Sequence, residues 1–159
     1  MDLAILAVVI VVLDQVSKYV VQTNMFEGQS IPILENIFHL TYINNPGAAF
    51  GMLPNKTSFF IVMSVVVFVG VIWYARTLPK QQRLTRLALG LVLGGAIGNL
   101  IDRVRFGAVV DFFDFRVWPV FNIADIAISV AVVLIIWELF RQEEDKSTVE
   151  PNGVSSMKE

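Results

Sequence analysis

The stretch GGAIGNLIDRVRFGAVVDFFDFRVWPVFNIADIAI, residues 94–128, joins two apolar segments and carries polar side chains where a membrane protein would have hydrocarbon. Its acids and amides include Asn99, Asp102, Asp111, Asn122 and Asp125. A carboxylate at membrane depth costs about 2.5–3.5 kcal/mol on insertion scales, so it needs a partner or a function. We therefore expect this stretch to form a site at the edge of a membrane, with the rest of the chain positioning it.

The composition is that of an integral membrane protein. Of the 159 residues, 55% are apolar and 16% are charged, whereas about 25% of the residues of a soluble domain are charged. The chain shows no basic stripe or aromatic RNA-binding motif, so we expect no nucleic-acid partner.

Cysteine is absent and histidine occurs once, as His39. Disulfides, a thiol nucleophile and a multi-histidine metal site are therefore excluded. We expect His39 to be a surface strand residue, and we expect no metal or cofactor. The catalysts that remain are carboxylates, or a serine paired with a lysine.

Four apolar blocks are long enough to be membrane-spanning helices, which need about 20 residues. We expect them at residues 3–21, 58–74, 87–101 and 120–140, with Pro119 as the helix-start residue of the last. Gly90, Gly94 and Gly98 recur every four residues on one face of the third block, which predicts close helix packing.

Two further stretches are expected outside the membrane. In residues 31–43, IPILENIFHLTYI, apolar and polar side chains alternate, which predicts a small antiparallel sheet on the membrane surface. Residues 44–54, NNPGAAFGMLP, contain small side chains around Gly47. They form either an ordinary turn or a clamp on an extended peptide.

The orientation follows from the loop at residues 75–86, which holds four basic residues and no acid. By the positive-inside rule this loop is cytoplasmic, so both termini are cytoplasmic and the connections 22–56 and 102–119 face outward together. We expect one four-helix membrane domain at residues 1–141 and a disordered cytoplasmic tail at residues 142–159.

Some acids have ready partners. Asp14 and Lys18 lie four apart on one helical face, and either neutralise each other within the bundle or support a nearby site. Asp102 adjoins Arg103 and Arg105, and we expect an ion pair there.

If residues 109–116 are extended, Asp114 shares a face with Arg116. By elimination Asp111 and Asp125 form a two-carboxylate hydrolytic site, or else both are merely carboxylates at helix ends. Two carboxyls about 3 Å apart cannot both ionise, so one can act as acid and the other as base.

The amides and Arg103 surround this pair in sequence. Asn122 lies one turn before Asp125 and could orient it. Asn99 and Arg103 share a face of the third span. Arg103 either binds a substrate carbonyl or lipid phosphate, or pairs with a neighbouring acid.

At these residues the chain resembles lipoprotein signal peptidase, the signal peptidase II family of bacterial aspartic proteases. The matching motifs are DQVSK (14–18), NPGAAFG (45–51), GGAIGNLIDR (94–103), VVDF (109–112) and FNIADIAI (121–128). They occur in family order from about Asp14 to Phe140. One departure is Pro46, where the family usually has threonine; proline removes a backbone donor there.

The resemblance implies a membrane all-α fold with a small β part: four transmembrane helices and an outer β-cradle. It implies cleavage of prolipoproteins before a diacylglyceryl-modified cysteine, by a catalytic dyad of Asp111 and Asp125. Substrate-binding or supporting roles follow for Asp14, Lys18, Asn45, Gly47, Asn99, Arg103 and Asn122. The expected partners are the diacylglyceryl-prolipoprotein, membrane lipid and globomycin-type inhibitors. We expect a monomer in the bacterial inner (cytoplasmic) membrane, with its active site near the outer leaflet.

Two other classes of function stay open on the residues alone. One is a Ser-Lys peptidase with Lys18 as base and Ser58 or Ser64 as nucleophile. The other is a small transporter whose buried aspartates carry protons or cations, although the internal repeats typical of transporters are absent from the sequence.

Overall fold

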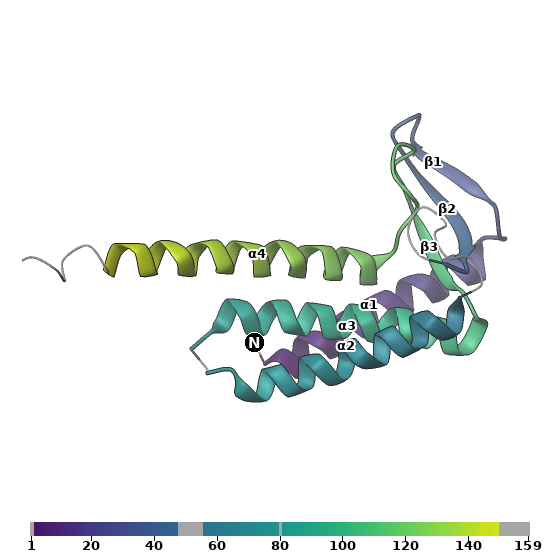
Figure 1. Ribbon diagram of the computed structural model, residues 1–159. Helices are drawn as coiled ribbons and strands as arrows, with labels where there is room; N and C mark the ends of the chain where they lie inside the picture. Colours follow the sequence, from purple (N-terminus) through teal and green to yellow (C-terminus); the bar gives the residue numbers. More distant parts are fainter. Residues whose placement is uncertain (1, 48–55, 80, 150–159) are drawn as a thin grey trace, which may run out of the picture.

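The computed structural model describes residues 2–47, 56–79 and 81–149 (Figure 1). In chain order the elements are α1 (Leu3–Asn24), β1 (Ser30–Leu34), β2 (Phe38–Asn45), α2 (Thr57–Thr77), α3 (Arg83–Phe106), β3 (Val109–Asp114) and α4 (Ile123–Val149). The four helices lie side by side, and the three strands form a sheet at one end of the bundle (Figure 1).

Each helix is long and apolar enough to cross a membrane, α4 over its segment Ile123–Gln142. The four expected spans are thus confirmed, and their polar ends extend the helices beyond the apolar blocks. Along α2, large apolar side chains such as Val62, Val69 and Trp73 are exposed. Because such a surface is unfavourable in water, lipid is its natural surrounding.

The fourth helix differs from expectation at both ends. It begins at Ile123, not at Val120, because Phe121 still forms a β-bridge with Phe113 and holds the chain extended; Pro119 therefore lies before the helix. At the other end α4 continues to Val149, past the domain boundary expected at residue 141. Glutamate, glutamine and lysine favour helix, so the polar segment can continue it. Residues 150–159 lie outside the described residues.

Helix α3 is the centre of the bundle, since α1, α2 and α4 all pack against it. Its glycines allow this. A Cβ added at Gly94 would lie 2.8 Å from the carbonyl oxygen of Ala7 in α1, and one at Gly95 would lie 2.6 Å from that of Ala124 in α4. The predicted glycine seam therefore faces α1, and Gly95 adds a second close approach on the side of α4.

The sheet is antiparallel with strand order β1-β2-β3. β1 and β2 form a hairpin, which confirms the small antiparallel sheet predicted from residues 31–43, and His39 lies in β2, half-buried. β3 adds to the far side of β2, with Ile43 opposite Asp111. Val21 of α1 packs with Tyr42, Val110 and Phe112 of the sheet. The sheet is thereby joined to the end of the bundle where α1 and α3 end and α4 begins (Figure 1).

We predict that Gly95→Ala lowers the free energy of unfolding by about 1–3 kcal/mol, because the new methyl group would overlap backbone and force α3 and α4 apart. The matched control is Gly70→Ala in α2, where an added Cβ meets nothing within 4 Å and helix propensity improves. Thermal unfolding in detergent measures both variants. Equal stability of the two would contradict the close packing of α3 on α4.

Candidate active site

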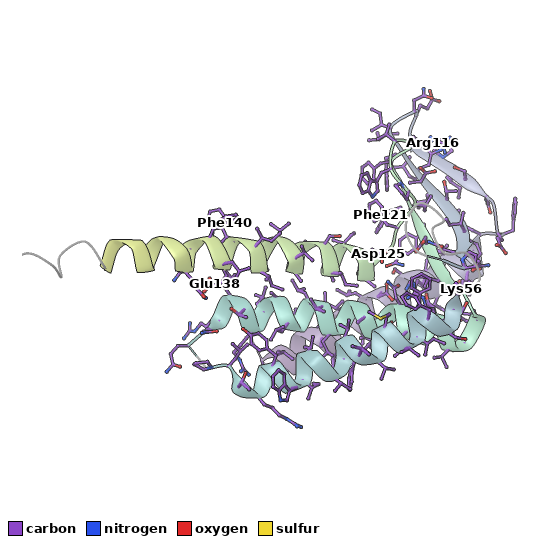
Figure 2. All side chains as sticks on the ribbon, in the orientation of Figure 1. Lys56, Arg116, Phe121, Asp125, Glu138 and Phe140 are labelled. Atoms are coloured by element: carbon purple, nitrogen blue, oxygen red, sulfur yellow. The ribbon has the colours of Figure 1, made fainter. Side chains whose placement is uncertain are left out.

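Two acidic side chains from separate elements line one cavity. Asp111 is the third residue of β3, and Asp125 lies in the first turn of α4. Figure 2 shows Asp125 at the end of α4 that meets the sheet. The cavity has a volume of about 480 Å³ and is also lined by Asn45, Gly47, Asn99, Arg103 and apolar residues of α4 and its approach. The structure therefore brings the two predicted carboxylates to one site.

The start of α4 positions Asp125 through a capping box. The side-chain oxygen of Asn122 accepts a hydrogen bond from the backbone N–H of Asp125 at 3.0 Å. In return, Asp125 Oδ2 accepts from the backbone N–H of Asn122 at 3.3 Å. Such reciprocal bonds satisfy helix N–H groups that otherwise lack partners. Asn122 thus orients Asp125, as expected, through the backbone as well as the side chain.

Asp111 is nearly inaccessible, with 2% of its surface exposed. Its Oδ1 accepts from Asn122 Nδ2 at 2.7 Å, and its Oδ2 accepts from Asn45 Nδ2 at 2.9 Å. Burial, and then the nearby Asp125 carboxylate, raise the pKa of Asp111 to about 7 against the opposing effect of these amide donors. Near neutral pH this carboxyl is therefore poised between its two protonation states.

Asn99 and Asn122 connect the two carboxylates. Asn99 Nδ2 donates to Asp125 Oδ1 at 2.8 Å, while Asn122 Nδ2 donates to Asn99 Oδ1 at 3.1 Å as well as to Asp111. Asn122 has no exposed surface. In an amide the nitrogen donates and the oxygen accepts, so these bonds fix the orientation of the Asn99 and Asn122 side chains.

Lys18 of α1 contacts Asn99 and has only 2% of its surface exposed. Its ammonium group forms ion pairs with Asp14 at 2.9 Å and with Asp102 at 2.8 Å, and donates to Asn99 Oδ1 at 2.9 Å. The predicted Asp14–Lys18 pair is confirmed, and Lys18 also contacts Asn99, which donates to Asp125.

The expected pairing of Asp102 with Arg103 or Arg105 was wrong. Asp102 lies four residues after Gly98, on the face of α3 that packs on α1, so it meets Lys18. The two arginines lie elsewhere around the helix: Arg103 is over the ring of Phe60, and Arg105 is over that of Phe106.

Sequence reasoning missed Gln15, which completes this buried cluster. Its Nε2 donates to Asp102 Oδ1 at 2.9 Å and also reaches Asp14 and the carbonyl of Gly98. Both carboxylates also accept backbone N–H groups: Ala124 N donates to Asp14 Oδ1, and Val110 N donates to Asp102 Oδ2, the oxygen that pairs with Lys18. A polar side chain in the middle of an apolar span was the signal that could have identified Gln15.

Arg103, Asn45 and Gly47 also line the cavity, and Gly47 contacts the other two. The Arg103 guanidinium lies 3.5 Å from the carbonyl oxygen of Gly47 and 4.9 Å from the Phe60 ring centroid. Asn45 Oδ1 accepts the N–H of Gly47 at 3.0 Å. The rest of the segment expected to be either a turn or a peptide clamp, residues 48–54, lies outside the described residues.

Asp114, by contrast, is not part of the cavity lining. It forms the predicted pair with Arg116 at 2.9 Å, although through a turn after the end of β3, and it accepts a hydrogen bond from Thr41 at 2.8 Å. Among the described residues, this leaves Asp111 and Asp125 as the acids that line the cavity.

Comparison with known proteins gives a consistent result. A family model described as "Signal peptidase (SPase) II" matches residues 6–141. The lipoprotein signal peptidase of Moorella thermoacetica is 50% identical over 139 residues, covering 87% of this chain and 93% of that protein. That of Halothermothrix orenii is 47% identical over 141 residues, covering 88% and 96%.

Two solved structures, both described as bacterial membrane enzymes, have the same fold. One superposes with a TM-score of 0.84 at 34% identity and covers 95% of this chain and 93% of its own. The other has a TM-score of 0.78 at 35% identity, with coverage of 85% and 90%.

We predict that Lys18→Met destabilises the protein by about 3–5 kcal/mol, because it leaves two buried carboxylates facing each other without a cation. Adding Asp102→Asn to this variant should recover part of the loss, since one of the two charges disappears. The control, Lys56→Met, removes an exposed lysine and should change stability by less than about 0.5 kcal/mol. Denaturation in detergent is the measurement, and wild-type stability of Lys18→Met would contradict the role given to the buried ammonium.

Proposed function

This chain belongs to the signal peptidase II family, the lipoprotein signal peptidases, and we propose that it is an aspartic endopeptidase whose catalytic pair is Asp111 and Asp125. The family is one of membrane peptidases that process prolipoproteins. The observation that carries the proposal is the meeting of two carboxylates from β3 and α4 in one cavity at the end of a membrane-spanning bundle.

The proposed reaction needs one carboxylate and one carboxylic acid. Asp111, with its pKa raised to about 7 by burial and by Asp125, is the acid. Asp125 is the base: it accepts two hydrogen bonds and lies in the first turn of α4, where the helix dipole stabilises negative charge. Asp125 takes a proton from a water molecule, and the resulting hydroxide adds to the carbonyl carbon of the scissile peptide bond.

The remaining proton transfers return both acids to their starting state. Asp111 donates its proton to the carbonyl oxygen as the gem-diol forms, and takes a proton back as the gem-diol collapses. Asp125 delivers the proton from water to the leaving nitrogen. The proposed steps use only the two carboxyl groups and a water molecule.

The proposed substrate is a diacylglyceryl-modified prolipoprotein, cut before its lipidated cysteine. Two features of the cavity support this substrate. Apolar side chains of α4, including Ile126, Ile128 and Val130, line one wall and suit an acyl chain. The Arg103 side chain also lines the cavity, and its guanidinium is placed to bind a backbone carbonyl of an extended peptide. Globomycin-type cyclic peptides would occupy the same space, and the enzyme would act as a monomer.

The proposed orientation places the site near the outer leaflet of the bacterial inner membrane. Arg76, Arg83 and Arg86 lie at the junction of α2 and α3, the end of the bundle opposite the sheet (Figure 1). Basic loops stay in the cytoplasm, so the sheet, the cavity and the start of α4 face outward, and both termini are cytoplasmic. In this arrangement residues 1–141 form one peptidase domain and residues 142–159 its cytoplasmic end.

The Ser-Lys alternative has less support. A lysine that acts as a base must be neutral, whereas Lys18 forms ion pairs with Asp14 and Asp102. The Ser64 hydroxyl donates to the carbonyl of Phe60 in its own helix. The peptidase chemistry is therefore assigned to the carboxylates.

We predict that Asp111→Asn and Asp125→Asn each reduce processing of a lipidated precursor by roughly 10²–10⁴-fold, because each removes one partner of the proton transfer. Both proteins should still insert and fold, since asparagine keeps the shape of the side chain. The control is Asp114→Asn, which changes an acid outside the cavity. Turnover at the wild-type rate by either site variant would exclude that residue from the mechanism.

The raised pKa of Asp111 predicts the pH dependence of the reaction. Asp111 is protonated below its pKa and ionised above it, so kcat/KM should fall as the pH rises through about 7. The amide of Asn45 lowers the pKa of Asp111 by donating to the carboxylate. In Asn45→Ala the falling limb should therefore move to higher pH, in addition to any loss of rate. A limb that stays in place would show that another group is the acid.

A further inference from the structure

A second cavity lies at the end of the bundle opposite the candidate active site. Its volume is about 340 Å³, and it lies between the end of α2, the start of α3 and the later turns of α4. Its polar lining comes from Tyr74, Thr77, Gln82, Thr85, Glu138 and Gln142. Hydroxyls and amides thus surround a single carboxylate.

Glu138 has an oxygen that the protein leaves unsatisfied. Its Oε1 accepts a hydrogen bond from Gln142 Nε2 at 3.1 Å. Its Oε2 is buried, and among the described side chains, those of residues 2–47, 56–79 and 81–142, it has neither a hydrogen-bond donor nor an ion-pair partner. In Figure 2, Glu138 lies on the side of α4 that faces α3, whereas Phe140 points away from the bundle. Burying a carboxylate oxygen without a donor is costly, so a cationic donor from outside would be bound favourably.

The separation of Asp125 and Glu138 along α4 matches the length of the apolar region of a signal peptide. Asp125 and Glu138 lie on the same helix, thirteen residues apart, which is about 20 Å along the axis. A signal peptide has a positively charged n-region followed by an apolar region of about 7–15 residues. As a helix that apolar region would be roughly 10–22 Å long. A peptide whose cleavage site lies at Asp125 therefore places its n-region at the depth of Glu138.

Building on the proposed function, we propose that this second cavity binds the basic n-region of the precursor, with Glu138 receiving a lysine ammonium or arginine guanidinium. The hydroxyls of Tyr74 and Thr77 and the amide of Gln82 add hydrogen-bond acceptors around the bound cation. Glu138 would then be a specificity residue that acts on the end of the substrate far from the reacting bond. It offsets the repulsion that a basic n-region meets from Arg76, Arg83 and Arg86 at the same end.

The experiment compares two lipidated precursor peptides that differ only in the n-region, one with two lysines and one with two glutamines. The wild-type enzyme should process the lysine peptide with a kcat/KM about tenfold higher, the effect of one charged hydrogen bond. In Glu138→Gln this preference should disappear, while kcat/KM for the glutamine peptide stays at the wild-type value. Glu27→Gln, the same change at an exposed position near the sheet, should keep the preference.

Glu138→Lys provides an independent test, since this variant should process a precursor with two glutamates in the n-region at a higher kcat/KM than the lysine peptide. The proposal is overturned if Glu138→Gln keeps the lysine preference, if it loses activity equally on both peptides, or if the wild type shows no preference. Cleavage of the glutamine peptide by the wild type, and its loss in Asp125→Asn, tests the proposed function separately. A failure of the n-region site is thus distinguished from a failure of the peptidase assignment.

Discussion

The ion pairs of Lys18 with Asp14 and Asp102 are the interaction on which the rest of the structure depends. One ammonium group, buried within hydrocarbon-spanning helices, joins α1 to α3. The same two carboxylates accept the N–H groups of Ala124 at the start of α4 and of Val110 in β3. The residue after each of these is one of the two acids of the site. The cluster therefore positions the backbone on which Asp111 and Asp125 are carried.

From Lys18 the hydrogen bonds continue in one direction toward the cavity. Lys18 holds the oxygen of Asn99, whose amino group then donates to Asp125, and Asn122 completes the connection to Asp111. In a membrane no water replaces a lost partner, so each missing bond would leave an unsatisfied polar group at high cost. A fully satisfied network has essentially one arrangement. The hydrogen-bond network within the bundle thus holds the two carboxylates in place. The sheet and Arg103 supply other parts of the cavity lining.

Much of this could be predicted from the sequence, because the signals were local. Four apolar blocks predicted four spans, the alternation in residues 31–43 predicted a small antiparallel sheet, and the glycines of the third span predicted close helix packing. That the glycines face α1 is known only from the structure. The Asp114–Arg116 pair was predicted, but from strand alternation, whereas the strand ends at Asp114 and the chain turns at Arg116. The choice of Asp111 and Asp125 came from elimination, since both lacked a basic neighbour in sequence.

What could not be predicted depends on contacts between distant segments. The partner of Asp102 is set by which face of α3 packs on α1, so its neighbours Arg103 and Arg105 were misleading. The third strand adds to β2 across more than sixty residues of sequence, and that pairing brings Asn45 to Asp111. The exact start of α4 depends on the bridge between Phe113 and Phe121, which overrides the helix-start preference of Pro119.

The most direct test is an experimental structure with a peptide inhibitor whose scissile amide is replaced by a secondary alcohol, so that the hydroxyl stands for the attacking water. We expect this hydroxyl to lie within hydrogen-bond distance, about 2.5–3.0 Å, of a carboxyl oxygen from both Asp111 and Asp125. A hydroxyl bound by only one of these carboxyls, with the other turned away from the cavity, would contradict a shared catalytic pair.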